Sequence, residues 1–213
     1  MEFISTLLSE YCEKHSEPES ELLSELNRET HLKVLSPRML SGHLQGRFLS
    51  FLSKLSKPNL ILEIGTYTGY SALCLAEGLN ENGRLITIDP NEETLLVAKK
   101  YFDRSVHKNK IDVICGDATK EINNLNVKFD IVFIDADKRN YSNYFDLVID
   151  KMNKGGLIIA DNVLWSGKIL DDENKMDKDT EAINNFNKKI NSDKRVTNLL
   201  LPVRDGLLLM IKN

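Results

Sequence analysis

Residues 60–71 read Leu60-Ile61-Leu62-Glu63-Ile64-Gly65-Thr66-Tyr67-Thr68-Gly69-Tyr70-Ser71. The apolar run at 60–64 is typical of a short buried strand, and the glycines at 65 and 69 allow a sharp turn. A helix is expected to follow at 70–79. Because a strand, a turn and a helix in this order form half of a βαβ unit, the segment predicts an α/β protein with a parallel sheet.

The same alternation continues on the C-terminal side of this segment. Strands are expected at 60–64, 84–89, 111–115, 129–134 and 157–160, with helices at 70–79, 92–102, 118–125 and 141–152. After a helix at 180–190, two apolar runs at 196–201 and 206–211 flank Pro202, and this spacing suits two antiparallel strands that close the sheet edge. The pattern predicts a Rossmann-like, doubly wound, mostly parallel seven-stranded sheet with helices on both faces and an antiparallel C-terminal strand. The polar stretch 171–179 is expected to be an exposed loop.

On the N-terminal side, residues 1–57 have helical, amphipathic spacing. Apolar residues recur at helical intervals around Leu7 and Tyr11, again around Leu23, and from Leu44 to a stop before Pro58. We expect one domain over 1–213, in which the helical region 1–57 covers the binding site and residues 58–213 form the core. The spacing leaves open whether these helices cover the chain's own sheet or pair with a second subunit.

Composition excludes several classes of protein. The 213 residues include 28 basic and 32 acidic side chains, a net charge of −4, which argues against a general nucleic-acid binder. Three scattered cysteines without a C-x-x-C pair exclude a disulfide framework and a cysteine zinc site, and they fit a reducing cytoplasm. No apolar run approaches the length of a membrane span, and residues 1–5 lack the basic start of a secretory signal. We therefore expect a cytoplasmic protein that binds neither membranes nor nucleic acid.

The first strand ends indicate a nucleoside site. In doubly wound sheets, ligands bind at the carboxyl ends of the strands. The turn at 65–69 lacks the G-x-G-x-x-G spacing, and Glu63 would repel phosphate, which argues against a dinucleotide. Asp89, at the second strand end, can accept both ribose hydroxyls of an adenosine, and Asp117 with Ala118 can contact an adenine edge. Alternatively, these acids only cap the following helices. A phosphate-free, positively charged adenosine such as S-adenosylmethionine fits this corner.

The fourth and fifth strands end in oxygen-bearing side chains. Asp135 follows the fourth strand, and Asp161 and Asn162 follow the fifth, so they are expected to converge. Two carboxylates and an amide are hard donors that suit Mg²⁺, Mn²⁺ or Ca²⁺. Without a cation, the two carboxylates would repel each other. The alternative is that Asp161-Asn162 is merely a turn.

Two further residues near this cluster are candidates for chemistry. Lys138 follows Asp135 by three residues, and a nearby dication would lower the pKa of its ammonium enough for general-base work. It is otherwise a surface lysine that starts the next helix. Trp165, the only tryptophan, follows Asp161 by four residues, and its indole is expected to form a wall for an aromatic acceptor or simply to pack.

Several stretches together resemble a known family. They are residues 62–71, Ile88-Asp89, residues 133–141 with Asp135-Ala136-Asp137-Lys138, residues 161–167 with Asp161-Asn162-Val163-Leu164-Trp165, and residues 201–206. In this order they resemble the class I S-adenosylmethionine-dependent methyltransferases, and among these the cation-dependent O-methyltransferases of the caffeoyl-CoA and catechol type. The resemblance runs from about Met39 to residue 213.

The resemblance implies roles for individual residues. It implies cofactor contacts from Met39, Ser41, Glu63, Gly65, Ser71, Asp89, Ala118 and Asp137; Thr66, Tyr67, Pro90, Asp117 and Asp135 complete our candidate cofactor set. It also implies metal ligation by Asp135, Asp161 and Asn162, a catalytic base at Lys138 beside Asp135, substrate contacts from Trp165 and Lys138, and a homodimer. Two stretches depart from the family pattern. Residues 41–46 differ from its usual acidic version, and 171–178 form a charged run beside the acceptor pocket.

The sequence thus predicts methyl transfer from S-adenosylmethionine to a hydroxyl of a catechol-like small molecule. Coordination to a divalent cation would ionise that hydroxyl, and Lys138 would take its proton. Two alternatives remain. A methyltransferase-fold binding module without turnover predicts a disrupted glycine turn or Asp-Ala-Asp-Lys segment, and both are intact. A nicotinamide-dependent oxidoreductase predicts binding of NADH and none of S-adenosylhomocysteine.

Overall fold

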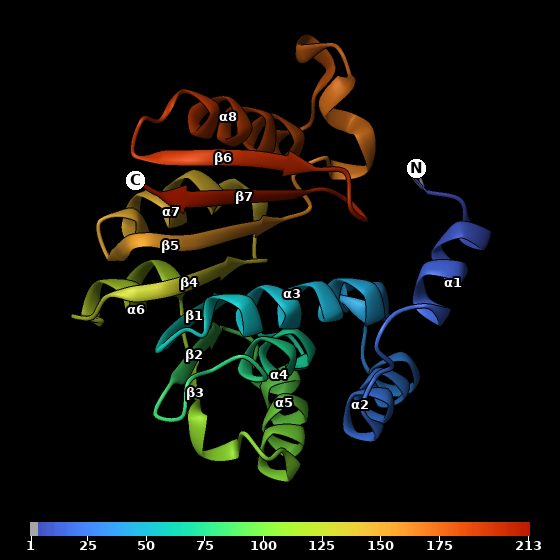
Figure 1. Ribbon diagram of the computed structural model, residues 1–213. Coiled ribbons are helices and arrows are strands. Elements are labelled where there is room, and N and C mark those ends of the chain that lie inside the picture. The colour runs from blue at the N-terminus through green and yellow to red at the C-terminus, as the bar shows by residue number, and fades with distance from the viewer. Residues whose placement is uncertain (1–3) are drawn as a thin grey trace.

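The computed structural model describes residues 4–213 and contains a seven-stranded sheet in the order β3-β2-β1-β4-β5-β7-β6 (Figure 1). The strands are β1 (Leu60–Ile64), β2 (Arg84–Asp89), β3 (Ile111–Cys115), β4 (Phe129–Ile134), β5 (Met152–Asp161), β6 (Val196–Leu201) and β7 (Leu207–Lys212). The first five are mutually parallel, whereas β7 runs antiparallel to both β5 and β6. This confirms the predicted sheet. The strand order reverses between β1 and β4, which is where such sheets bind ligands.

Helices cover both faces of the sheet. The helices are α1 (Thr6–Lys14), α2 (Glu21–Lys33), α3 (Gly42–Ser56), α4 (Tyr70–Ala76), α5 (Glu92–Arg104), α6 (Ala118–Asn124), α7 (Tyr141–Ile149) and α8 (Lys178–Ser192). Short 3₁₀ turns are η1 (Pro37–Met39), η2 (Lys108–Lys110), η3 (Lys138–Asn140), η4 (Trp165–Leu170) and η5 (Glu173–Lys175). One apolar core joins α6, α7 and α8 to the sheet, and a second joins α2, α3, α4 and α5 to its other face. Figure 1 shows these two helical layers behind and in front of the strands.

The structure corrects two predicted boundaries in the core. The helix expected at 141–152 ends at Ile149, because Met152 already pairs with Phe129 in the sheet. β5 is therefore ten residues long, and Gly155-Gly156, which precede the strand expected at 157–160, lie inside it. The pairing between β4 and β5 shifts register between Phe129 and Ile131, so these glycines accompany an irregularity in the strand rather than its start. The stretch 171–179, expected to be a loop, contains the short turn η5.

The N-terminal helices divide into two kinds. Helices α2 and α3 pack on the chain's own core, α2 against α4 and α5 and α3 against α4: Leu26 and Leu49 are fully buried, and Glu29 on α2 accepts hydrogen bonds from Lys100 and Tyr101 on α5. Helix α1 has no buried residue, and it lies to one side of the sheet in Figure 1. The question that the spacing left open is thus answered for α2 and α3 but not for α1.

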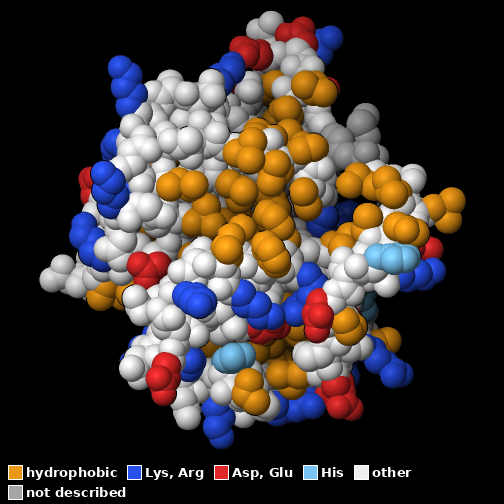
Figure 2. Space-filling model, in the orientation of Figure 1, with side chains coloured by type: hydrophobic (Ala, Val, Ile, Leu, Met, Phe, Trp, Pro, Cys, Tyr) orange, Lys and Arg blue, Asp and Glu red, His pale blue; other side chains and the backbone are white. Residues whose placement is uncertain are grey.

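Part of one face of the molecule is apolar. Figure 2 shows hydrophobic side chains gathered over β5, β7 and β6, and a second group over α1. Leu199 and Ile211 are about half exposed on this part of the sheet, and Leu7 and Tyr11 are mostly exposed on α1. The sheet face beside α3 is therefore not fully covered within the described chain. None of the described helices combines the length and hydropathy that crossing a bilayer requires.

Candidate active site

The carboxyl ends of β1 and β4 come into direct contact through Gly65. Its φ is +99°, and a Cβ at this position would lie 1.9 Å from the carbonyl oxygen of Asp135. The backbone N–H of Asp135 also donates to the carbonyl of Ile64 at 2.9 Å. Only glycine fits this backbone conformation and this spacing, so the glycine turn places the first strand end beside the predicted carboxylate cluster.

Asp89 holds the glycine turn. Its Oδ2 accepts a hydrogen bond from the N–H of Tyr67 at 2.8 Å, and its Oδ1 accepts one from the N–H of Asn91 at 2.9 Å. The turn also contacts its surroundings: the hydroxyls of Thr66 and of Thr87 on β2 are 2.5 Å apart, and the Tyr67 hydroxyl donates to the carbonyl of Leu35. Each carboxylate oxygen of Asp89 keeps a lone pair, so holding the turn is compatible with accepting a ligand hydroxyl.

Glu63 is fully buried beside the glycine turn. The Thr87 hydroxyl donates to its Oε2 at 2.5 Å, whereas its Oε1 is buried without a hydrogen-bond partner. Burial raises the pKa of Glu63 to about 8, and the neighbouring Asp135 and Asp89 contribute in the same direction. At pH 7 the carboxyl is therefore mostly neutral, so the phosphate repulsion expected from its charge is much reduced. The unpaired Oε1 is an acceptor that a bound hydrogen-bond donor can satisfy.

Asp117 caps the N-terminus of α6, as the alternative to a role in adenine binding predicts. Its side chain accepts from the N–H of Thr119 at 2.9 Å and from the Thr119 hydroxyl at 2.7 Å, and these bonds lower its pKa. Ala118, the first residue of α6, is buried directly behind it. Asp137 is also occupied, by the Tyr144 hydroxyl at 2.6 Å and the Asn140 amide at 2.9 Å.

The other candidate cofactor residues differ in exposure. Ser71 is buried in the first turn of α4, and Ser41 is buried at the start of α3. Met39 is 59% exposed, and Pro90 follows the end of β2 at the surface. Ser41 thus lies inside the protein, whereas Met39 presents its side chain to solvent.

Lys138 brings the second cluster together. Its Nζ donates to Asp135 Oδ1 at 3.1 Å, to Asn162 Oδ1 at 2.8 Å and to the Tyr141 hydroxyl at 2.6 Å. The side chain is only 10% exposed, so Lys138 is not a surface lysine. The hydroxyl of Tyr141 also lies 3.0 Å from the carbonyl of Asp161. Tyr141 is not among the site residues predicted from the sequence. Its position three residues after Lys138 is the signal that could have placed it near that lysine.

Asp161 is held on both of its oxygens. Its Oδ1 accepts from the N–H of Asn162 at 2.7 Å, and its Oδ2 accepts from the side-chain amide of Gln45 at 2.6 Å. Burial, with the nearby Asp135, raises the pKa of Asp161 to about 6. The φ of Asn162 is +58°, a left-handed conformation that asparagine tolerates better than most residues. This turn aims Asp161 and Asn162 into the same site.

The donor set fits a hard cation. Asp135, Asp161 and Asn162 offer only oxygen atoms, and the ammonium of Lys138 already lies between two of them, so the site accommodates positive charge. No cluster of three or more His, Cys, Asp or Glu side chains able to hold a metal occurs in residues 4–213. The candidate donor set therefore counts the amide oxygen of Asn162 as its third member.

Trp165 lies beside Lys138. The ammonium of Lys138 is 5.9 Å from the centre of the indole and 4.8 Å from that of the Tyr141 ring. Trp165 and the following Ser166 both have positive φ, and the Ser166 N–H donates to Asp205. The indole Nε1 is buried without a partner. The backbone at Trp165-Ser166 is therefore strained, and Asp205 of the β6–β7 turn holds it in place.

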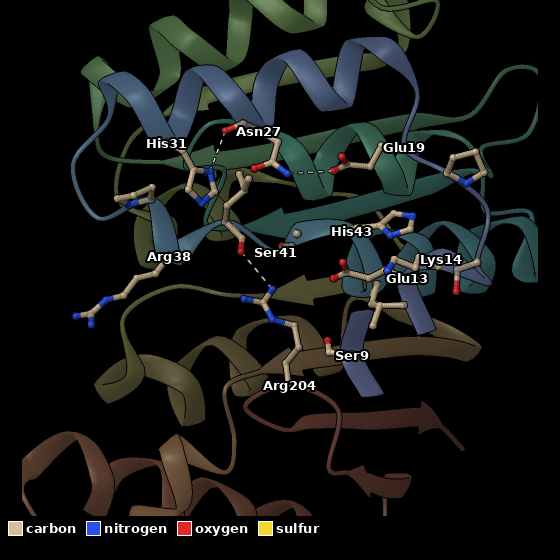
Figure 3. A pocket seen from close by; sticks show the side chains of 16 residues that line it. Ser9, Glu13, Lys14, Glu19, Asn27, His31, Arg38, Ser41, His43 and Arg204 are labelled. Atoms are coloured by element: carbon tan, nitrogen blue, oxygen red, sulfur yellow. Dashed lines mark hydrogen bonds between the residues drawn. The ribbon is translucent and has the colours of Figure 1, made fainter. Parts of the chain in front are cut away.

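A cavity of about 790 Å³ adjoins the site on the side of the N-terminal helices (Figure 3). It is lined by residues of α1, α2, η1 and the start of α3, together with Arg204 from the β6–β7 turn. Of the predicted site residues, it includes Ser41. Arg204 connects it to the carboxylate cluster, because its Nη1 donates to Gln45 Oε1 at 3.1 Å. Sequence reasoning missed Gln45 and Arg204.

Comparison with known proteins places this site in a family. Residues 13–213 match the family model described as O-methyltransferase. The chain is 32% identical to a probable caffeoyl-CoA O-methyltransferase 2 of Dictyostelium discoideum, over 95% of this chain and 90% of that protein. It is 35% identical to a catechol O-methyltransferase of Niastella koreensis, over 78% of this chain and 79% of the relative.

Solved structures agree with the sequence relatives. An O-methyltransferase from Bacillus cereus, crystallised with SAH, superposes with a TM-score of 0.88 at 29% identity, covering 97% of this chain and 98% of that one. A putative O-methyltransferase from Klebsiella pneumoniae gives 0.91 at 27% identity, covering 97% and 96%. These findings confirm the predicted fold and the resemblance on which the site was assigned. The chain therefore belongs to the O-methyltransferase family that includes caffeoyl-CoA and catechol O-methyltransferases.

Proposed function

We propose that the protein transfers the methyl group of S-adenosylmethionine to a hydroxyl of a small catechol-like acceptor in a reaction that needs a divalent cation. The observation that carries this proposal is the cluster at the ends of β4 and β5. There, Lys138 bridges Asp135 and Asn162 beside the buried carboxyl of Asp161. Oxygen donors, a lysine and an aromatic wall in one place are the groups that metal-assisted methylation of a phenol requires.

The side chains at the carboxyl ends of β1 and β2 support S-adenosylmethionine as the cofactor. Glu63 Oε1 is an unpaired buried acceptor, and Asp89 has lone pairs free for the ribose hydroxyls. The carboxyl of Asp89, and that of Glu63 once a bound cation favours its ionised form, match a cationic, phosphate-free nucleoside. Solved relatives contain SAH, as in the Bacillus cereus enzyme, or SAM, as in the TomG O-methyltransferase of Streptomyces achromogenes. The further cofactor contacts that we assign include Ser41, Gly65, Ser71 and Ala118.

The cation would be held by Asp135, Asp161 and Asn162, with Mg²⁺ as the expected ion and Mn²⁺ or Ca²⁺ as substitutes. When bound there, it lowers the pKa of a coordinated acceptor hydroxyl. Lys138 would take the hydroxyl proton once it has given up one of the three protons that it donates here to Asp135, Asn162 and Tyr141. Trp165 forms a wall beside the same nitrogen and orients the acceptor ring. Fixing the acceptor oxygen against the methyl group provides much of the acceleration.

The test is a methylation assay with labelled S-adenosylmethionine across catechols, flavonoids and acyl-CoA thioesters. We expect a catechol-type acceptor to be methylated, EDTA to abolish the reaction, and Mg²⁺ to restore it. Asp161→Ala should reduce the rate to the level seen in EDTA and retain binding of S-adenosylhomocysteine. Asp112→Ala is the matched control. Asp112 lies on β3, its side chain is partly exposed and pairs with Arg84 on β2, and its loss should leave full activity. Full activity in EDTA would contradict the cation, and binding of NADH in place of S-adenosylhomocysteine would contradict the cofactor.

We also propose a single catalytic domain in which residues 1–57 form one wall of the acceptor site, a cytoplasmic location and a homodimer. Gln45 and Ser41, both from the N-terminal region, support the first point. The free thiols of Cys12, Cys74 and Cys115 support a reducing compartment. The exposed apolar side chains of α1 support the dimer.

A further inference from the structure

Two consecutive hydrogen bonds through three side chains connect the β6–β7 turn to the candidate metal site. Arg204 Nη1 donates to Gln45 Oε1 at 3.1 Å, and Gln45 Nε2 donates to Asp161 Oδ2 at 2.6 Å. Gln45 lies on α3 and is 1% exposed, so water does not compete for these bonds. Arg204 also donates to the carbonyl of Leu40 at 3.2 Å, which ties it to the segment that leads into α3.

The chemistry of the three groups determines their order. An ionised carboxylate only accepts hydrogen bonds and a guanidinium only donates them, so the group between them must do both. The amide of Gln45 donates through nitrogen and accepts through oxygen, and only one orientation of the amide satisfies both neighbours. A methionine or leucine would leave both polar neighbours without this partner, while a glutamate would place a second acceptor against Asp161.

Asp161 and Arg204, at the two ends of this hydrogen-bonded series, are each held by other contacts. The N–H of Asn162 holds the other oxygen of Asp161, so both carboxylate oxygens are constrained. The turn that carries Arg204 is held against the segment after Asn162, because the N–H of Val163 donates to the carbonyl of Gly206 and that of Leu164 to Asp205. A Cβ at Gly206 would lie 2.8 Å from the backbone nitrogen of Leu164, so this approach requires glycine. Gln45 therefore connects two rigid points.

We propose that Gln45 is a positioning residue for the divalent cation: it orients the carboxylate of Asp161 and is itself oriented by Arg204. This role rests on the cation site of the proposed function and adds a residue outside the donor set. Hydrogen bonds to ligating carboxylates contribute to metal affinity without contacting the metal. Because Gln45 belongs to α3, the affinity for the cation also depends on how α3 is docked.

The experiment measures the dissociation constant of Mn²⁺ by electron paramagnetic resonance, with no acceptor or turnover involved. The variants are Gln45→Met, Arg204→Met and the double variant. Ser53→Ala is the matched control, because Ser53 is a buried polar residue on the same helix whose hydroxyl bonds the carbonyl of Leu75, away from the site. Affinity for S-adenosylhomocysteine and the melting temperature are measured alongside.

We expect Gln45→Met to weaken Mn²⁺ binding by about 10–100-fold, the range found for such supporting hydrogen bonds, and to leave affinity for S-adenosylhomocysteine unchanged. Arg204→Met should weaken Mn²⁺ binding less. Added to Gln45→Met, it should cause no further loss, because Arg204 acts through Gln45. Ser53→Ala should bind Mn²⁺ like the wild type.

Other outcomes would overturn the proposal. Equal Mn²⁺ affinity in the wild type and Gln45→Met contradicts the role of Gln45 alone, and so does a proportionate loss of S-adenosylhomocysteine affinity, which indicates general loss of structure. If Gln45→Met does not fold, Arg204→Met, a change at an exposed residue of the β6–β7 turn, tests the same connection, and unchanged Mn²⁺ affinity there contradicts it. A wild type that binds no Mn²⁺ contradicts the cation of the proposed function as well.

Discussion

The buried carboxyl of Glu63 makes stability depend on pH. Its pKa is raised from 4.5 to about 8 because burial disfavours the charged form, so the folded protein binds a proton that the unfolded chain releases near pH 4.5. The stabilisation is complete below pH 4.5 and is lost as the pH rises towards 8.

We therefore predict that Glu63→Gln flattens the pH profile of stability. Between pH 5 and 8, the free energy of unfolding of the ligand-free wild type should fall relative to the variant by up to about 1.4 kcal/mol per pH unit. Urea unfolding of both proteins across this range measures the difference, and effects of other groups, such as His107, cancel in it. Parallel profiles would show that Glu63 does not take up the proton.

At the scale of single residues, contacts that depend only on position along a strand could be predicted from the sequence. Asp135, Asn162 and Lys138 meet because each stands at or just after the carboxyl end of β4 or β5, and parallel strands end at one edge. Gln45 could not be predicted in this way. It is 116 residues from Asp161 in the chain, and only the docking of α3 brings the two together.

Among the elements, α2 illustrates how an N-terminal helix packs on the helical layer of the core. Leu23 and Leu26 are buried in the core shared with α4 and α5, whereas Leu32 on the same helix is 71% exposed. The helix is also tied to α5 by the ion pair of Glu29 with Lys100.

We predict that Leu26→Ala lowers the free energy of unfolding by about 2–5 kcal/mol, since it leaves a cavity in this core. Leu32→Ala, the matched control, should change it by less than about 0.5 kcal/mol. Chemical denaturation of both variants measures the two values. Similar losses in both would mean that burial of the inner face does not anchor α2.

Element types were more predictable from sequence than element ends. Every predicted strand of the core is present, because alternation of apolar strands and helices is a repeated signal. β5 begins five residues earlier than predicted, and it includes Gly155 and Gly156, which weaken the apolar strand pattern at this point. Their incorporation depends on the pairing of Met152 with Phe129 in β4, a contact that no local pattern reveals.

For the molecule as a whole, α1 provides the clearest argument for a dimer. A helix of nine residues is marginal in water by itself, and α1 has no buried residue. Its exposed Leu7 and Tyr11, together with the apolar face of β5, β7 and β6, form surfaces that a second copy can cover.

We predict a molar mass in light scattering of twice the 24.3 kDa of one chain. The double variant Leu7→Glu with Tyr11→Glu should be a monomer. Leu96→Glu, which charges an equally exposed leucine on α5, should remain dimeric. A wild type of single-chain mass would contradict the dimer, and a dimeric double variant would exclude α1 from the interface.

The strand order has a consequence for synthesis of the chain. β7, at residues 207–212, is made after β6 yet lies between β5 and β6, bonded to both. While a ribosome still encloses these residues, β5 has an open edge and β6 has no neighbour, so the nascent sheet can be neither complete nor closed to other chains. Deletion of β7 would thus disconnect β6 as well, and would leave a sheet with β5 as an unpaired edge that is prone to aggregation.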